Sequence, residues 1–521
     1  MKNQQKKTEA DMKLKIKRFL STILCLSMLL GMTSNIAYAM DTADNTTEDV
    51  IGMDEEGNIW TVEDDTSGVV VENIRSRSAS TKIVNFRANA EGIDVTTTTT
   101  YNEYDTGNIG YLYGKSGADA AYLGMEDGKV KFMISGVIGL VDASAVQVVS
   151  MSSVASYSNY YANGTNLIHN VCTNMTSSQY GATINVGPQP SYLQTGATYY
   201  SYDGHYFYTD YDQMISDYVA NTRVNSVNEG NPYYNYYQYL PLRSTTVYSA
   251  NELVNMINAK TSTSSKLYNT GSTFVLYQNT YGVNALLMAS VAAVESGWGT
   301  SGIAQSKNNL FGLNAVDSSP GESANYYSSV TQCIKDFAET YMSKRYLRAG
   351  YTYYNGGFLG NKASGINVRY ASDPYWGEKI AAVAWSLDTT NGGADQYRYT
   401  IGIKDIYAYD HTNLNVRQEA TTASTVLYQT GNCSHYAFII WGESNNFYQV
   451  QSDPVLVNGR SAVDTSTGAY NASSMYAYAS KDYVAVVSEG EKEYCLILVC
   501  RQKIYHQVYI TYILRQILIM R

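Results

Sequence analysis

The fold of this chain is decided by the stretch Val283-Asn284-Ala285-Leu286-Leu287-Met288-Ala289-Ser290-Val291-Ala292-Ala293-Val294-Glu295-Ser296-Gly297-Trp298-Gly299. Its apolar residues, together with Phe274, lie close to one stripe at helical spacing, which predicts a helix buried on one side. Gly297 and Gly299 then end that helix. Glu295 is therefore expected at a helix C-terminus, close to the aromatic ring of Trp298.

The position of Glu295 predicts a particular chemistry. A carboxyl group that leaves a buried helix into a cleft loses hydration, and the negative end of the helix repels its charge, so both effects raise its pKa. Such a group stays protonated near neutral pH and acts as a general acid, which the cleavage of a glycosidic bond requires. Because a lone glutamate at a helix end is usually a surface charge, this interpretation depends on the neighbouring motifs.

Three further segments support it. Asn308 to Leu313 follows at loop spacing, and Asp317 to Glu322 is turn-rich and predicts a β-hairpin that folds over the cleft. Its acids would supply a second carboxylate, which stabilises an oxocarbenium-like transition state or orients water. Asn367 to Gly377 then places aromatic and polar residues before the last helix.

Glu295 to Leu313 and Gly360 to Lys379 together resemble the glucosaminidase domain of glycoside hydrolase family 73, a family of secreted bacterial autolysins. The resemblance covers about 190 to 388. It implies a mostly helical, lysozyme-like catalytic domain with a β-hairpin lobe. It also implies endo-β-N-acetylglucosaminidase activity on peptidoglycan glycan strands, cutting after N-acetylglucosamine and before N-acetylmuramic acid.

Carried over residue by residue, the resemblance makes Glu295 the catalytic acid and places Tyr370 where it assists the reacting N-acetyl group. For the second carboxylate, Glu322 ranks before Asp317 because it lies further into the hairpin. Retention, inversion and acetamido-assisted chemistry all stay open. Glu378 is expected to be a structural ion-pair partner. The candidate sugar-binding residues, with core packing as the alternative for each aromatic, are Trp298, Asn309, Phe311, Tyr375 and Trp376.

The N-terminus has the layout of a secretory signal peptide. Basic residues from Lys13 to Arg18 precede an apolar run from Phe19 to Met32, and Ala37-Tyr38-Ala39 follows. The apolar run is too short for a stable membrane anchor. We therefore predict a secreted, extracellular protein that acts at the cell wall.

The composition of the rest of the chain predicts an α+β, multidomain protein. Small all-β, SH3-like domains are expected on both sides of the catalytic domain. Tyrosine makes up 51 of the 521 residues and crowds the start of the catalytic region, where a surface that grips sugar rings and a packed aromatic layer are equally expected. The predicted parts are the signal peptide 1–39, an acidic linker or leader 40–95, a small all-β domain 96–150, a connector 151–189, the catalytic domain 190–388, an SH3-like domain 400–487 and an atypical tail 489–521.

The region 400–487 is similar to bacterial SH3-like domains, which bind cell-wall peptides or glycans. The similarity rests on Leu414 to Arg417, Trp441 and Phe447 to Val450. Such a module concentrates an enzyme on an insoluble substrate. The composition of the tail 489–521 matches no domain pattern. Either a strand-prone tail or a shifted reading frame would explain it.

Charge and cysteine content exclude several function classes. Without the signal peptide the chain has 29 basic and 44 acidic residues, and no dense basic cluster that would bind nucleic acid appears. Its scattered cysteines and histidines predict neither a disulfide framework nor a metal site, and no cofactor is expected. Cys333 is a buried thiol on a helix rather than a peptidase nucleophile. A muramidase, a lytic transglycosylase and a non-catalytic wall-binding adhesin remain the alternatives.

Overall fold

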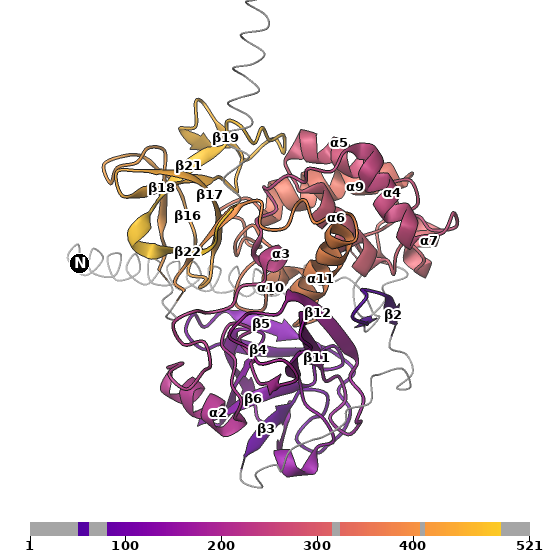
Figure 1. Ribbon diagram of the computed structural model, residues 1–521, viewed down its shortest axis with the longest axis vertical. Coiled ribbons are helices and arrows are strands. Elements are labelled where there is room, and N and C mark those ends of the chain that lie inside the picture. Colours follow the sequence, from indigo (N-terminus) through magenta and orange to yellow (C-terminus); the bar gives the residue numbers. More distant parts are fainter. Residues whose placement is uncertain (1–50, 62–80, 315–322, 407–411, 491–521) are drawn as a thin grey trace, which may run out of the picture.

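The computed structural model describes residues 51–61, 81–314, 323–406 and 412–490 (Figure 1). The predicted signal peptide, Asp317 and Glu322 of the predicted hairpin, and the tail from residue 491 lie outside the described residues. The predicted α+β class is confirmed. The description "mostly helical" does not hold for the chain as described, because strands occupy both of its ends and helices gather between Tyr211 and Thr389.

A seven-stranded antiparallel sheet forms the N-terminal β unit, in indigo and purple in Figure 1. Val130, Phe132 and Ile134 are buried on one of its strands, as their alternation predicts. The sheet begins at Lys82, so it includes residues before the expected start at 96. In order across the sheet, the strands are β5 (Ile109–Leu112), β4 (Thr99–Glu103), β8 (Val137–Asp142), β7 (Lys129–Ile134), β6 (Asp119–Glu126), β3 (Lys82–Asn85) and β9 (Gln147–Ser150).

Residues 151–189, expected to be a connector, carry most of a second antiparallel sheet. Tyr160 and His169 stack across neighbouring strands, with ring centroids 4.1 Å apart. Sequence alternation is weak here because aromatic and polar residues fill both faces of these strands. A single 3-10 turn, Met151–Ser153, precedes the sheet. Its strands, in spatial order, are β12 (Ala182–Pro188), β11 (Asn166–Val171), β10 (Asn159–Ala162) and β13 (Thr198–Tyr199).

The tyrosine-rich segment is a packed aromatic layer. Tyr199, Tyr208, Tyr237 and Tyr239 are each at most 2% exposed. Ring pairs such as Tyr208 with Tyr218, at 6.0 Å and nearly perpendicular, have the edge-to-face geometry that aromatic cores favour. Of the two predicted roles for this segment, the structure therefore supports core packing.

The helical part surrounds one buried helix. Ser249 and Glu252 form the predicted capping box at the start of the helix Ala250–Lys260. The single stripe predicted from Phe274 to Val294 is in fact two helices, because Gly282, at φ +62°, caps the first of them. The helices are α2 (Tyr211–Ala220), α3 (Tyr236–Tyr239), α4 (Ala250–Lys260), α5 (Gly271–Tyr281), α6 (Ala285–Glu295), α7 (Gly302–Lys307), α9 (Val330–Asp336), a π-helix (Phe337–Tyr346), α10 (Asn367–Tyr370) and α11 (Trp376–Thr389).

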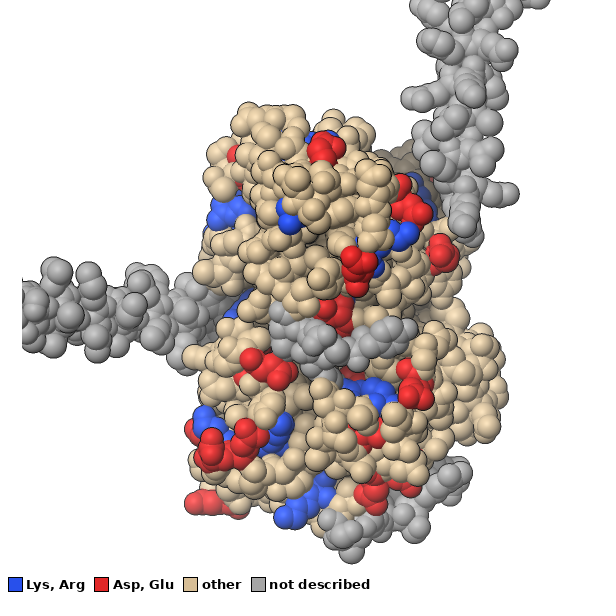
Figure 2. Space-filling model, turned by 90° about the vertical axis from the view of Figure 1, so that its left-hand side faces the viewer, with Lys and Arg blue, Asp and Glu red and all other residues tan. Residues whose placement is uncertain are grey.

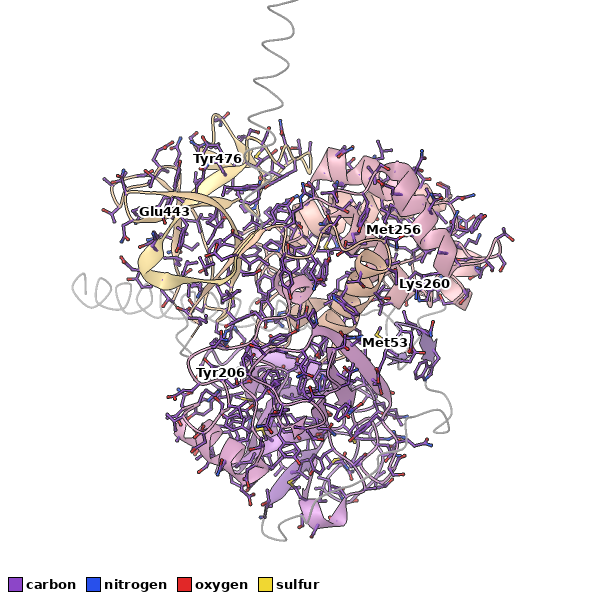
Figure 3. The ribbon with its side chains drawn as sticks, in the orientation of Figure 1. Met53, Tyr206, Met256, Lys260, Glu443 and Tyr476 are labelled. Carbon is purple, nitrogen blue, oxygen red and sulfur yellow. The ribbon has the colours of Figure 1, made fainter. Side chains whose placement is uncertain are left out.

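A short hairpin rests on these helices. It consists of β1 (Ile51–Met53) and β2 (Ile59–Thr61), and Met53 is fully buried. Lys260 Nζ, near the end of α4, donates to the Glu56 carbonyl at 3.3 Å, and Figure 3 shows Lys260 and Met53 in the same region. Part of the segment predicted to be a linker is therefore packed on the helical part.

The C-terminal β unit contains a second seven-stranded antiparallel sheet, in yellow and orange in Figure 1. Its first strand pairs with its last, which brings the two ends of the unit together. Across the sheet the strands are β16 (Val426–Gln429), β15 (Asn415–Arg417), β21 (Tyr476–Ser480), β18 (Phe447–Gln451), β17 (Ala437–Ser444), β14 (Thr400–Lys404) and β22 (Val484–Ser488), with a separate pair β19 (Leu456–Val457) and β20 (Ala462–Val463) and a 3-10 turn Lys481–Tyr483.

A buried arginine joins this unit to the helices. Arg243 is 1% exposed, and its Nε donates to the Asp453 carbonyl of the C-terminal unit at 2.7 Å. Its other nitrogens donate to the Tyr281 carbonyl at 2.7 Å and to Ser343 Oγ at 3.1 Å. The guanidinium also lies 3.9 Å from the centre of the Tyr470 ring. One side chain thus satisfies acceptors from both parts, and the two parts form a single packed body.

On the face shown in Figure 2, acidic and basic side chains are interspersed over a mostly uncharged surface. None of the helices in the described ranges is long and apolar enough to cross a membrane.

We expect Arg243→Ala to lower the free energy of unfolding by about 3 kcal/mol or more, because it leaves several buried carbonyl groups without a charged donor. Chemical denaturation followed by circular dichroism measures this change. Arg348→Ala is the matched control. Arg348 Nη1 also donates to a carbonyl of the C-terminal unit, that of Thr465, but this bond is exposed. Its effect should stay within about 0.5 kcal/mol, and equal effects of both variants would contradict the assignment.

Candidate active site

Glu295 is the last residue of α6, a helix whose eleven residues are all buried. The sequence predicted burial on one side only, but a helix that is apolar all round must be enclosed by other elements. At its start, the Asn284 side chain accepts from the main-chain N–H groups of Leu286 and Leu287. Glu295 itself is 6% exposed. A rigid, enclosed helix thus holds this carboxyl group at the end that the sequence predicted.

The turn after Glu295 has an unusual backbone. Gly297, Trp298 and Gly299 have φ values of +53°, +55° and +77°, three left-handed residues in succession. This conformation is uncommon for a tryptophan, and non-glycine residues held in it gather at functional sites. The Trp298 N–H returns to the Ala293 carbonyl at 2.7 Å, and Ser265 Oγ donates to the Trp298 carbonyl at 2.6 Å. These bonds fix the turn and leave the Trp298 side chain half-buried.

Trp376 binds the Glu295 carboxyl group directly. Its indole Nε1 donates to Glu295 Oε1 at 2.5 Å, and the residue is 3% exposed. Trp376 is the first residue of α11, which packs along α6 (Figure 1). The sequence suggested a sugar contact or core packing for Trp376, and the structure shows it orienting the predicted acid.

Tyr370 lies behind Trp376. Their rings are 4.7 Å apart between centroids and tilted by 32°. Tyr370 is fully buried, and its hydroxyl donates to the Phe311 carbonyl at 3.0 Å. This places Tyr370 in the site's immediate surroundings, where it supports the indole that contacts Glu295.

Two predicted sugar contacts prove to be structural. The Asn309 amide nitrogen donates to the Leu313 and Asn325 carbonyls at 2.9 and 3.2 Å, and its oxygen accepts from the Leu313 N–H at 3.0 Å. Asn309 is 1% exposed, so its side chain shapes the loop from inside. Phe311 is fully buried and stacks on Phe337 at 3.8 Å. A buried loop needs internal partners for its polar groups, which explains both positions.

Tyr375 and Glu378 pack against the N-terminal sheets. The Tyr375 ring packs edge-to-face on His169, with centroids 4.8 Å apart. Glu378 Oε2 lies 2.8 Å from His169 Nδ1, and both residues are buried. Glu378 therefore has a buried structural partner, and the pair is ionic when His169 is protonated.

The N-terminal β unit holds the segment that leads into Trp376, which the sequence did not reveal. Ser135 Oγ donates to the Pro374 carbonyl at 2.5 Å, and the Tyr113 N–H donates to the Ser372 carbonyl at 2.9 Å. The Tyr111 hydroxyl donates to the Arg369 carbonyl at 3.0 Å. These partners are more than 230 positions apart in the chain, so no local pattern could have indicated them.

Lys362, in the motif from Gly360 to Gly365, is enclosed at the same junction. Its Nζ donates to the Ala371 carbonyl at 2.9 Å and lies 4.7 Å from the centre of the Tyr111 ring. Burial, with a contribution from the charge of Arg369, lowers the pKa of this ammonium group to about 7. Lys362 therefore supports the loop before α11 rather than offering a charge to a ligand.

The other candidate groups are placed as follows. Asp317 and Glu322 lie outside the described residues, so the second carboxylate stays a prediction. Cys333 is fully buried on α9, and burial raises the pKa of its thiol to about 12, as expected for an inert cysteine. Within the described ranges, no three His, Cys, Asp or Glu side chains come together to hold a metal ion.

The same stretch of chain is recognisable by comparison. Residues 271–389 match the Glucosaminidase family. That family is described as mannosyl-glycoprotein endo-beta-N-acetylglucosaminidase. Two Streptococcus pneumoniae proteins, named as inferred endo-beta-N-acetylglucosaminidases, are 34% identical over 271 residues, which is 52% of this chain. The chain spans about a third of the length of these curated relatives, 36% and 34%.

Solved structures of Staphylococcus aureus autolysin E show a more distant similarity. One is the protein itself, and another is a catalytic mutant in complex with the disaccharide NAG-NAM. They are 23% and 22% identical to this chain, with TM-scores of 0.23 and 0.24. Each match covers 30% of this chain and 73% of the solved one.

The turn that carries Glu295 has a testable requirement at Gly299. A Cβ atom there would lie 2.6 Å from the Leu267 main-chain nitrogen and 2.5 Å from Ser265 Oγ. We expect Gly299→Ala to lower the free energy of unfolding by more than about 2 kcal/mol, because the left-handed backbone and the collision both disfavour alanine.

Gly302→Ala is the matched control, because a Cβ atom at Gly302, the first residue of α7, would meet nothing within 4 Å. It should change stability by less than about 1 kcal/mol. Thermal and chemical unfolding of both variants measure the difference. A neutral Gly299→Ala would show that the turn does not adopt this conformation.

Proposed function

We propose that this chain is a peptidoglycan hydrolase, an endo-β-N-acetylglucosaminidase that hydrolyses the GlcNAc-β-1,4-MurNAc bond. The observation that carries the proposal is the buried Glu295, at the end of α6 and hydrogen-bonded by Trp376, within the segment that matches the Glucosaminidase family. The names of the Streptococcus pneumoniae relatives support the same activity.

In the proposed reaction, Glu295 is the general acid. Its proton passes to the glycosidic oxygen as the bond between that oxygen and the anomeric carbon breaks, so the leaving sugar departs as an alcohol. The Trp376 N–H donates to Oε1 of this carboxyl group and so fixes its orientation. Water then supplies the new hydroxyl at the anomeric carbon, and the proton that this water loses restores the protonated acid.

The remaining roles rest on the family resemblance. Glu322, or Asp317 in its place, would stabilise the positive charge or orient the water. Tyr370 is fully buried, so it would act on the reacting N-acetyl group through Trp376, against which its ring packs. Trp298 is the retained candidate for a sugar contact, because the turn leaves its side chain half-buried next to Glu295.

The rest of the chain fits an enzyme that acts outside the cell. We propose that residues 1–39 direct secretion and that the C-terminal unit, 400–487, is an SH3-like domain that contacts the cell wall. Through Arg243 and Asp453 this unit is packed rigidly on the helical part, so a wall ligand bound there would lie at a constant distance from Glu295.

Product analysis tests the bond specificity. We expect the mature chain to release new reducing ends from purified peptidoglycan, and borohydride reduction with mass spectrometry to identify them as N-acetylglucosamine. Glu295→Gln should lower the rate by at least about 100-fold while the protein still binds the wall. Reduced N-acetylmuramic acid would indicate a muramidase, anhydro ends a transglycosylase, and binding without new ends an adhesin.

The role of Trp376 is tested by removing its N–H donor. Trp376→Phe should lower kcat by about 10- to 100-fold, the range for loss of one hydrogen bond to a charged group. Trp385→Phe is the matched control on the same helix, because the Trp385 indole nitrogen makes no hydrogen bond among the described residues. Steady-state rates on soluble glycan fragments measure both. Similar rates for the two variants would remove Trp376 from the site.

A further inference from the structure

Trp441, on β17 of the C-terminal unit, is 53% exposed. Leaving so large an apolar ring in water forgoes the stabilisation that its burial would give. Between residues 437 and 451 it is the only large apolar side chain that is exposed. Glu443, two residues further along β17, lies on the outer side of the unit, away from the helices (Figure 3).

The backbone presents this ring outward by an irregularity of the sheet. Ile440 pairs with Val450 and Gly442 with Gln449, so Trp441 is an additional residue between two adjacent pairs. Such a bulge changes the direction of the side chain it carries. At the next residue, Gly442, a Cβ atom would meet nothing within 4 Å apart from its chain neighbours, so the bulge is open on that side.

The ring is nevertheless held in one orientation. Trp441 Nε1 donates to Gln451 Oε1 at 2.8 Å, and Gln451 is itself 3% exposed and donates to the Tyr470 hydroxyl at 2.6 Å. The buried Tyr399 ring packs edge-to-face against the indole, with centroids 5.6 Å apart. Because the N–H is already bonded, the exposed part of the indole is its apolar carbon surface. A ligand would meet a surface that needs no further ordering.

The same contacts tie the ring to the helical part. The Tyr399 hydroxyl donates to the Thr245 carbonyl at 3.1 Å, just before α4. Together with the Arg243 junction, this contact keeps Trp441 at a constant position relative to Glu295.

We propose that Trp441 is a stacking platform for a pyranose ring of the glycan strand, a binding site separate from the active site. A pyranose has an apolar C–H face and a polar rim, which matches a flat apolar ring with the polar Gln451 side chain at its edge. A single exposed ring offers much less than the roughly 800 Å² per partner that a stable protein interface buries. The identity of the glycan rests on the proposed function.

Binding to peptide-free glycan strands tests the platform. In the Glu295→Gln background, which leaves the substrate intact, adding Trp441→Ala should weaken binding to soluble peptidoglycan glycan strands by about 5- to 20-fold. Tyr483→Ala is the matched control, because Tyr483 is 49% exposed in the same unit. It should bind like the Glu295→Gln protein, and unchanged thermal unfolding confirms that the variants fold.

Three outcomes would overturn the platform. The first is equal binding with and without Trp441. The second is that Trp441→Ala loses binding to whole walls but not to peptide-free strands, and the third is a dimer that becomes a monomer in Trp441→Ala. The first removes the site, the second indicates a peptide ligand and the third a second copy of the chain. The proposed function is tested separately, by assaying new reducing ends with the chain that retains Glu295 and Trp441. Glycan binding that needs Trp441 without any cleavage would support the platform alone, and cleavage with unaltered binding would contradict the platform alone.

Discussion

The hydrogen bond from the Trp376 indole to the Glu295 carboxyl group joins two residues 81 positions apart, and the arrangement of the site follows from it. It requires that α11 begin beside the end of α6, which in turn requires that α6 be enclosed on all sides. The left-handed turn at Gly297, Trp298 and Gly299 then ends the helix directly after this buried carboxyl group. Tyr370 and Phe311 fill the volume behind the indole, so its orientation is determined by packing.

Both β units contribute to this arrangement although neither contains the acid. The N-terminal sheet holds the segment before Trp376 through Ser135 and Tyr113, and the C-terminal unit accepts the buried Arg243. Buried polar contacts of this kind are costly to break, because each separated group loses its partner. The three parts are therefore joined by buried polar contacts, which suits the proposed action on an insoluble polymer.

Local patterns in the sequence predicted the parts of the site that depend on neighbours along the chain. The capping box at Ser249, the helix end after Glu295 and the burial of Cys333 each involve residues within a few positions of one another or one apolar stripe. For the individual aromatics, the sequence leaves both a sugar contact and core packing open. Phe311 and Tyr375 sit in the core, since the same side chain suits a sugar or a packed interior and only its surroundings decide.

By itself, the sequence determined the α+β class, the main helices and the glutamate at the end of the apolar helix, because helix periodicity, caps and glycine turns act over short distances. Only the tertiary structure decided that Trp376 contacts Glu295, that Asn309 shapes a loop, and that residues 151–189 form a sheet. These outcomes depend on contacts between distant segments. Such contacts arise when the whole core closes, and no local pattern in the chain encodes them.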